Sequence, residues 1–487
     1  MSLAPALRLS TACDAPVRQD GKYVLYWMTA ARRTHSNYAL DHALARAREL
    51  NRPLLVLEAL RCDYPWACDR FHAFVAHGMR DNAARFARAR VAYHPYIEPE
   101  RGAGKGLLHA LAADACLVVG DEFPCFFLPR MHAAAAARMP VRFELVDGNG
   151  VMPLRALERT FTTANSLRRH LFKHATPFLD QRPVLDPLAR LDLPALDVPA
   201  EVQRRWPRAD EALLRADVAA LARLPIDHAI APFGEGGSRA AEQRLKALVH
   251  QLIHRYDEQR NDPDTPATSG LSPYLHFGHV SAHAVLHALE RPNPARKRPA
   301  KAPEKGQRAA FWGVIDDAEG FADQLVTWRE IGYNFCHRRP DDYDHYESLP
   351  SWARDTLADH ARDRRSPQYT LAQLTAADTY DRLWNAAQRQ LRDEGTIHNY
   401  LRMLWGKKIL EWSPSPQEAL ANLIELNNRY ALDGRNPNSY NGIFWVLGRY
   451  DRAWGPERPI FGKIRYMSSD NTARKVHVKQ YLVRHAA

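Results

Sequence analysis

Short apolar runs alternate with longer helical patterns through the first third of the chain. The apolar runs cover residues 23–28, 54–60, 116–119 and 141–146, with a weaker run at 91–96. Between them, apolar residues recur at helical spacing over residues 38–50, 71–89, 107–113 and 131–139. Because a parallel strand must be followed by a crossover, this alternation predicts an α/β domain with a parallel sheet covered by helices on both faces.

The pattern changes twice further along the chain. Residues 186–235 are punctuated by prolines and contain some helical pattern, and the stretch as a whole predicts an interdomain linker. From about Ser238 the apolar spacing is helical and strand patterns nearly vanish. We therefore predict an α/β domain over residues 1–185, a linker over 186–235 and an all-α domain over 236–487. Residues 295–307, rich in lysine and proline, predict an exposed basic loop.

Composition narrows the class of protein and of partner. The 487-residue chain has a formal net charge of +11, and its pI is near 9.4, which favours a polyanionic partner such as nucleic acid. The six scattered cysteines form no CxxC pair, so we expect reduced thiols, no disulfide framework and no metal. No run of about 18 apolar residues occurs, and the N-terminus makes a poor signal peptide. We expect a cytoplasmic monomer with no obligate protein partner.

The segment from Leu271 to Ser281, with sequence LSPYLHFGHVS, follows a small polar cluster at Thr268, Ser269 and Gly270. Ser272 and Pro273 predict an N-cap and a first helical position. Hydroxyls and free amides at a helix start can hold a phosphate group. A Ser-Pro pair on its own is more often an ordinary capped helix, so this pattern leaves both interpretations open.

Tryptophans recur in a second block. Trp405 and Trp412 are seven residues apart, hence on one helical face, and Trp384 precedes them. Periodicity alone favours core aromatics. Indole is also an oxidisable side chain, so closely packed tryptophans can relay charge.

Two further blocks carry polar and basic residues. Residues 426–440 predict a helix end that leads into the Asp433-Gly434 and Asn436-Pro437 turns. In residues 458–467, Lys463 and Arg465 alternate with apolar residues, as in a basic and aromatic DNA-binding surface. A solvated edge strand or loop is the alternative for that last block.

Taken together, these blocks closely resemble the photolyase/cryptochrome family, particularly class II cyclobutane pyrimidine dimer photolyases. The resemblance covers most of residues 236–480 and much less of residues 20–180. It implies a Rossmann-like antenna domain followed by a helical FAD-binding domain, with an antenna chromophore of unknown identity. The residues it assigns to FAD binding are Tyr256, Arg260, Thr268, Ser269, Gly270, Leu271, Ser272, Arg402, Asn427, Asp433 and Gly434.

The resemblance also implies residue roles. Trp405 would be nearest the flavin, Trp384 intermediate and Trp412 outermost in a series that passes electrons inward from the surface. Asn427 would face the reactive edge of the flavin and influence its redox states, and Asp433 would pair with Arg402 beside the ring. A structural salt bridge is the plain alternative for that pair.

For the DNA substrate, the resemblance assigns Trp328 and Trp445 to the walls of the lesion pocket. Arg465 would enter the gap left by the flipped lesion, with Lys463 beside it on the basic surface.

The chain departs from the family pattern at two positions. Gln324 stands where the family has a catalytic glutamate that hydrogen-bonds the dimer; glutamine can donate a hydrogen bond but cannot deliver a proton. Asp323, about 100° around the helix, would point elsewhere. Ile397 replaces a methionine typical of dimer photolyases. Both substitutions are similar to (6-4) photolyases and animal cryptochromes, yet the two histidines expected for (6-4) repair would fall at Asn399 and Met403.

The leading prediction is therefore a deoxyribodipyrimidine photo-lyase, a carbon–carbon lyase. In it, light-excited FADH⁻ passes an electron to a flipped cyclobutane pyrimidine dimer in UV-damaged DNA. The alternative is a cryptochrome-like blue-light photoreceptor that reduces its flavin in light but repairs little or nothing.

Overall fold

The computed structural model describes residues 3–189, 191–292, 298–299 and 303–486. Much of the predicted basic loop at 295–307 lies outside the described residues. The chain divides into two compact units. Unit 1 comprises Met1–Glu158, Ala175–Lys246 and Leu271–Arg291, and unit 2 comprises Arg159–His174, Ala247–Gly270 and Pro292–Ala487. The domain boundaries expected at residues 185 and 236 remain a prediction.

Unit 1 is built on a six-stranded sheet with the order β1-β6-β5-β2-β3-β4. All neighbouring strands run parallel except β1 and β6, which are antiparallel. The predicted α/β fold with a parallel sheet is confirmed, with one unpredicted edge strand, β1. The strands are β1 (Leu9–Cys13), β2 (Tyr23–Met28), β3 (Leu54–Leu60), β4 (Ala92–Ile97), β5 (Ala115–Glu122) and β6 (Phe143–Asp147).

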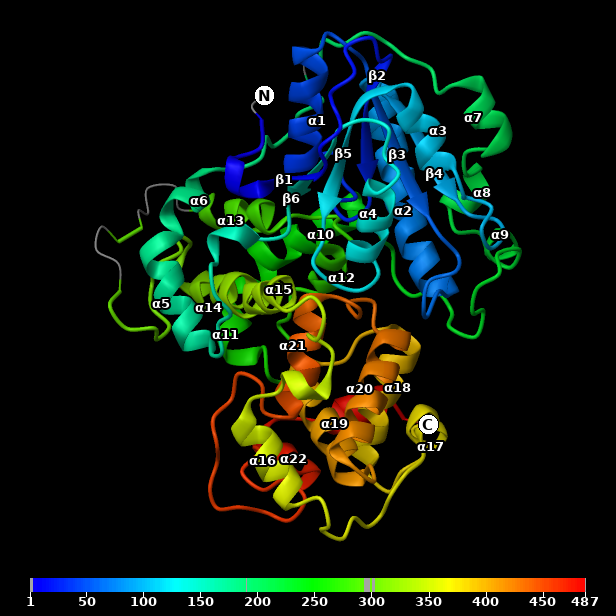
Figure 1. Ribbon diagram of the computed structural model, residues 1–487. Helices are drawn as coiled ribbons and strands as arrows, with labels where there is room; N and C mark the ends of the chain where they lie inside the picture. Colours follow the sequence, from blue (N-terminus) through cyan, green and yellow to red (C-terminus); the bar gives the residue numbers. More distant parts are fainter. Residues whose placement is uncertain (1–2, 190, 293–297, 300–302, 487) are drawn as a thin grey trace. The chain divides into compact units, whose positions relative to one another are not determined.

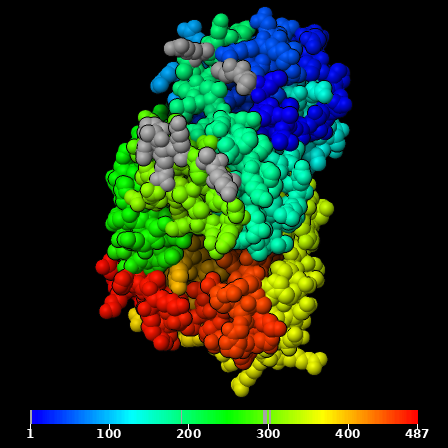
Figure 2. Space-filling view, turned by 90° about the vertical axis from the view of Figure 1, so that its left-hand side faces the viewer, coloured from blue at the N-terminus to red at the C-terminus, as the bar shows by residue number. Residues whose placement is uncertain are grey.

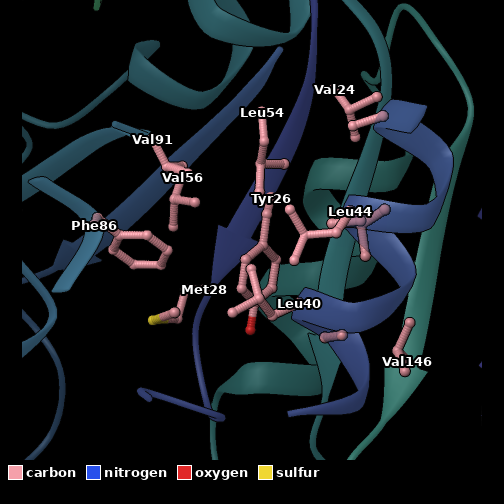
Figure 3. Close-up of a cluster of buried hydrophobic side chains, with 14 of the residues drawn as sticks. Val24, Tyr26, Met28, Leu40, Leu44, Leu54, Val56, Phe86, Val91 and Val146 are labelled. Carbon is pink, nitrogen blue, oxygen red and sulfur yellow. The ribbon is translucent and has the colours of Figure 1, made fainter. Parts of the chain in front are cut away.

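Helices cover both faces of this sheet. On one face, Leu40 and Leu44 of α1 pack against Tyr26 of β2 in a buried apolar cluster (Figure 3). On the other face, Leu107 and Leu111 of α3 belong to a second buried cluster, together with the β2 side chains that point away from α1, such as Leu25. The helices between the strands are α1 (Tyr38–Glu49), α2 (Asp69–Arg88), α3 (Leu107–Ala113) and α4 (Leu128–Ala136).

The proline-punctuated stretch is more ordered than its composition suggests. It contains the short helices α7 (Ala200–Arg205), α8 (Glu211–Leu214) and α9 (Val218–Leu221). Trp206 is buried in the second face of the sheet, and its indole Nε1 donates to the carbonyl of Ala103 at 2.9 Å. The stretch therefore packs on unit 1. The rest of unit 1 holds α6 (Thr176–Asp180), most of α10 (Ser238–Ala247), α12 (Ser272–His276) and α13 (Ala282–Glu290).

Unit 2 is helical, as predicted, and its described residues contain no strand. α19 packs against α18, α20 and α21 (Figure 1). The helices of this group are α18 (Arg382–Glu394), α19 (Asn399–Trp412), α20 (Pro416–Tyr430) and α21 (Pro437–Val446). A π-helical segment, η6 (Gln324–Trp328), joins α14 (Glu319–Asp323) to α15 (Arg329–Arg338).

The other α-helices of unit 2 are α5 (Ala164–His174), α11 (Tyr256–Gln259), α16 (Ser351–Asp359), α17 (Leu371–Ala376), α22 (Ser469–Lys475) and α23 (Lys479–Arg484). Among them, α5 contacts η6 and α11 contacts α14, whereas α17 and α23 contact α18. The C-terminal segment borders the segment around Asp262 (red against green in Figure 2), where His477 Nδ1 lies 2.6 Å from the Asp262 carboxylate. Among the described residues, no helix has both the length and the apolar character needed to span a membrane.

Candidate functional site

The helix in the predicted phosphate-binding segment begins one residue earlier than the sequence predicted. Ser272 is the first residue of α12, Leu271 occupies the N-cap position, and no side chain caps this helix. The prediction of Ser272 as the N-cap was therefore wrong. Gly270 has φ of +64°, a conformation that favours glycine because it has no Cβ. Thr268, Ser269 and Gly270 belong to unit 2, and Leu271 and Ser272 begin the next segment of unit 1.

Gln324, one of the two residues that depart from the family pattern, is the first residue of the π-helical segment η6, and Trp328 is the last. The side chain of Arg260, which follows α11, lies beside Gln324. When its amide is oriented to suit its neighbours, Gln324 Oε1 accepts from Arg260 Nη1 at 3.2 Å and from Trp328 Nε1 at 3.3 Å. Because both neighbours are donors only, the amide oxygen must face them. The NH₂ group of Gln324 then points away from this pair as a hydrogen-bond donor.

The side chains of Tyr256 and Arg260 lie close together next to Gln324. The Arg260 guanidinium lies 5.7 Å from the Tyr256 ring centroid, and Phe321 packs edge-on against the same ring at 5.1 Å. Burial raises the pKa of the Tyr256 phenol, which therefore stays protonated.

Asp323 is turned away from the site, as predicted. Its carboxylate accepts two hydrogen bonds from Arg168, at 2.7 and 2.8 Å, and a third from the Thr327 hydroxyl at 2.7 Å. These partners occupy Asp323, so it cannot replace the missing glutamate at position 324.

Trp328 and Trp445 form a stacked pair. Their ring centroids are 4.8 Å apart with an interplanar angle of 10°, and both side chains are partly exposed. The backbone carbonyl of Trp328 accepts from Asn441 Nδ2 at 3.1 Å, which fixes η6 against α21. The indole Nε1 of Trp445 is buried without a partner in the described part of the chain. Two partly exposed indole faces and a free donor suit a flat, polar-edged ring.

The three tryptophans of the predicted relay lie together in the core of unit 2. Trp384 Nε1 donates to the carbonyl of Trp405 at 2.9 Å, and the rings of Trp384 and Trp412 meet edge to face at 5.3 Å. Trp405 Nε1 donates to Gln388 Oε1 at 2.8 Å. The exposed fractions are 2% for Trp405, 0% for Trp384 and 1% for Trp412, so all three are buried.

Arg402 and Asp433 form the predicted ion pair, with Nη2 and Oδ1 3.2 Å apart and both side chains mostly buried. Asn427 Nδ2 donates to Ser439 Oγ at 2.7 Å, which anchors its amide between α20 and α21. A Cβ on Gly434 would lie 2.9 Å from the Asn427 carbonyl oxygen, so only glycine fits there without a shift.

Lys463 and Arg465 lie on an exposed loop between α21 and α22, and no regular strand forms there. Lys463 Nζ pairs with Glu457 at 3.1 Å, and this hydrogen bond lowers the pKa of the Glu457 carboxyl. The Arg465 guanidinium lies 4.6 Å from the ring centroid of Trp454, and Arg452 lies 4.5 Å from the same ring. The loop therefore brings two guanidinium groups close to one aromatic ring, a combination that is common on nucleic-acid-binding surfaces.

Several buried donors in unit 2 have no partner in the described part of the chain. Among them are Arg260 Nε and Gln388 Nε2. The two ring nitrogens of His398 are also unpartnered, and because burial lowers its pKa to about 4, one of them is a donor and the other an acceptor. Unpaired buried donors are costly unless a ligand or water accepts from them. A polar ligand such as a flavin, with ring carbonyls and phosphates, fits this donor set. Gln388 and His398 were not predicted as site residues, because no residue pattern marks a buried polar group that lacks a partner.

The fold and the site together define a class of protein. A parallel α/β unit is joined to a helical unit that holds a buried tryptophan series, a charged Arg–Asp pair and a stacked tryptophan pair. The class is a two-unit protein whose helical unit holds buried aromatic and charged residues together with unpartnered polar donors.

Comparison with known proteins identifies the family. The chain is 32% identical to the deoxyribodipyrimidine photo-lyase of Methanothermobacter thermautotrophicus, over 95% of this chain and 94% of that protein. Its identity to the enzyme of the same name is 34% in Oryza sativa and 32% in Arabidopsis thaliana, over 95% and 96% of this chain. No protein-family model matches. The chain belongs to the photolyase/cryptochrome family, and the predicted enzyme class, a DNA photo-lyase, is confirmed at the level of the family.

A solved structure supports the fold. A bacterial class III photolyase from Agrobacterium tumefaciens aligns with a TM-score of 0.68, over 95% of this chain and 86% of that one. Its sequence identity is only 18%, so this likeness shows the fold alone.

Proposed function

We propose that this chain is a class II-like photolyase that binds FAD in unit 2 and splits cyclobutane pyrimidine dimers in UV-damaged DNA. Bound FAD, in its reduced form, supplies the light-absorbing group and the electron for the reaction. The predicted binding residues hold different parts of the cofactor. Arg260 and the polar residues Thr268 and Ser269 hold the cofactor's phosphates, and the Arg402–Asp433 pair sets fixed charges beside its ring.

The observation that carries this proposal is the stacked Trp328–Trp445 pair beside Gln324. Stacking offers a face for the two pyrimidine rings of a flipped lesion. The Gln324 amide, with its oxygen held by Arg260 and Trp328, presents its NH₂ group to a pyrimidine carbonyl. A hydrogen bond there stabilises the negative charge that the lesion gains with the electron.

The basic loop supplies the DNA-binding part of the proposal. Lys463 and Arg465 neutralise backbone phosphates, and Arg465 occupies the gap that the flipped lesion leaves. A net charge of +11 favours the same partner. An antenna chromophore in unit 1, a monomeric state and a cytoplasmic location complete the proposal.

Lesion binding tests the proposal directly. We expect the flavin-loaded protein to bind a fluorescent duplex with one thymine dimer more tightly than the undamaged duplex, as measured by anisotropy in the dark. Trp328→Ala should weaken binding of the damaged duplex by about 5- to 150-fold, because stacking contributes roughly 1–3 kcal/mol per base. Trp66→Phe, in unit 1, is the matched control and should bind as the wild type does. Equal affinity of the wild type for both duplexes would contradict the proposal.

A further inference from the structure

The buried end of the tryptophan series has no route to water through Trp412 itself. Trp412 is 1% exposed, and its Nε1 has no hydrogen-bond partner in the described part of the chain. No described side chain is placed to take the proton of an oxidised indole at this position. A positive charge there can instead be passed to a neighbouring ring.

Two tyrosine rings contact Trp412 at the distance that separates Trp412 from Trp384. The Tyr369 ring lies 5.2 Å from Trp412 at 77°, and the Tyr380 ring lies 5.7 Å away at 67°. The corresponding Trp384–Trp412 values are 5.3 Å and 71°. Both tyrosines are thus placed as well as Trp384 to exchange an electron with Trp412.

Exposure distinguishes the two tyrosines. Tyr380 is 61% exposed, whereas Tyr369 is partly buried and its hydroxyl oxygen accepts from the Tyr380 backbone N–H at 3.0 Å. Oxidation of a phenol near neutral pH requires loss of the hydroxyl proton, since the phenol pKa of about 10 drops steeply when an electron is removed. Water at the Tyr380 hydroxyl can take that proton directly.

Lys408 biases the electron transfer in the same direction. Its Nζ lies 5.4 Å from the Trp412 ring centroid and 5.9 Å from that of Tyr380, and Glu411 holds it at 2.9 Å. A nearby cation stabilises a neutral ring through its quadrupole and disfavours a positively charged ring. Oxidised Trp412 is positively charged, whereas oxidised Tyr380 is neutral after it loses its proton. Lys408 therefore opposes charge on Trp412 and does not oppose the tyrosyl product.

We propose that Tyr380 is the surface terminus of the electron-transfer series, one step beyond Trp412. This inference rests on the proposed function, in which unit 2 binds FAD. Here the bound flavin starts in its oxidised form and accepts an electron when light excites it. One electron leaves the Tyr380 phenol and passes through Trp412, Trp384 and Trp405 to the flavin, while the phenol proton goes to water. The remaining neutral tyrosyl radical is restored by a small thiol, which gives up one electron and one proton.

Electron paramagnetic resonance after a light flash tests this assignment in the full-length, flavin-loaded protein. With oxidised flavin and no added reductant, the freeze-quenched wild type should show a tyrosyl radical whose spectrum narrows when ring-deuterated tyrosine is incorporated. Tyr380→Phe should lose this signal and leave a tryptophan radical. Tyr369→Phe, the matched control at the other contacting ring, should keep the tyrosyl signal.

A wild-type protein that shows only tryptophan radicals would overturn the inference. So would a tyrosyl signal that survives in Tyr380→Phe and disappears in Tyr369→Phe. Repair by protein with chemically reduced flavin keeps this result separate from the proposed function, because that reaction needs no electron from the surface. Repair should be equal in Tyr380→Phe and in the wild type, and its absence from both would count against the proposed function instead.

Discussion

A glutamine at position 324 changes what this position can do at different pH values. An amide donates a hydrogen bond in every protonation state of the protein, whereas a carboxyl donates only when it is protonated. Because the oxygen of Gln324 is held by Arg260 and Trp328, its NH₂ group is a fixed donor. Glutamine in place of glutamate at position 324 therefore loses the ability to deliver a proton. It gains a hydrogen-bond donor that is present at every pH.

The first prediction concerns Gln324→Glu. The Arg260 guanidinium favours the ionised carboxylate, which cannot donate to the lesion. We expect the variant to repair dimers best at low pH and to lose rate as pH rises through the pKa of the new carboxyl. The wild type should lack this titration. The measurement is the quantum yield of repair against pH with chemically reduced flavin.

The second prediction concerns Gln324→Leu, which is close in size but has no donor. Loss of one donor aimed at a developing negative charge should lower the yield of repair by about 100-fold at every pH. The bound flavin should stay in place, and its visible absorbance checks this. A Leu variant as active as the wild type would show that Gln324 does not contact the lesion.

Site residues that belong to sequence motifs could be predicted from the sequence, and site residues outside those motifs could not. The Arg402–Asp433 ion pair forms and the three tryptophans lie together, as predicted, while their positions relative to a flavin stay a prediction. Tyr380 belongs to no motif, because its role depends on a tertiary contact with Trp412 and on its exposure. No spacing in the sequence encodes either property.

At the scale of elements, the residue that caps α18 fixes the start of the helix that carries Trp384. The Asp381 carboxylate caps this helix, with Oδ1 accepting from the backbone N–H groups of Leu383 at 3.1 Å and Trp384 at 3.0 Å. Its other oxygen accepts from the Ser469 hydroxyl, which ties the start of α18 to α22. One side chain thus fixes a helix end and the backbone of a relay residue.

The third prediction follows from this cap. Asp381→Ala should lower the free energy of unfolding by about 1–2 kcal/mol, as measured by urea denaturation. Ser415→Ala is the matched control, since Ser415 caps α20 through a single hydrogen bond to Glu418 at 3.1 Å and should cost about 0.5–1 kcal/mol. A smaller loss for Asp381→Ala than for Ser415→Ala would contradict the account.

Sequence patterns predicted the buried elements better than the half-buried ones. The limits of β2 and β3 agree with the predicted runs, because buried strands are continuously apolar. Strand β1 escaped prediction because it is a partly buried edge with the mixed sequence LSTAC. The stretch with α7, α8 and α9 was predicted as linker because its prolines interrupt the helical pattern. The stretch nevertheless forms short helices and buries apolar residues such as Trp206, Leu214 and Leu221.

At the scale of the whole molecule, unit 1 contains an unusual set of neutral histidines. Burial lowers the pKa of His35, His72, His94 and His132 to about 4 and that of His279 to about 3. Burial and Arg8 also hold the pKa of His283 well below its usual value. In the unfolded chain all six would titrate near pH 6.5.

The fourth prediction is a loss of stability in mild acid. Below pH 6.5 the unfolded chain binds protons at these histidines and the folded chain does not, so stability falls towards pH 4. Each contributes roughly 1.4 kcal/mol at one pH unit below 6.5. Asp41 and Glu122 oppose this, because burial raises each pKa to about 7 and they bind protons first in the folded state.

The destabilising effect of the six histidines is larger than the stabilising effect of the two carboxyls. We therefore expect the free energy of unfolding to fall by a few kcal/mol between pH 7 and pH 5.5. Urea unfolding at a series of pH values measures it. Stability that stays level or rises over this range would contradict the burial of these histidines as neutral groups.

The central claim is that light and reduced flavin allow this protein to split a pyrimidine dimer. The most direct measurement illuminates the flavin-reduced protein with an oligonucleotide that carries one thymine dimer and follows the ultraviolet absorbance of the bases. The account predicts that absorbance is restored in light and not in the dark, and that Trp328→Ala abolishes the restoration. No restoration by a protein that still reduces its flavin in light would contradict the claim and favour a cryptochrome-like light sensor.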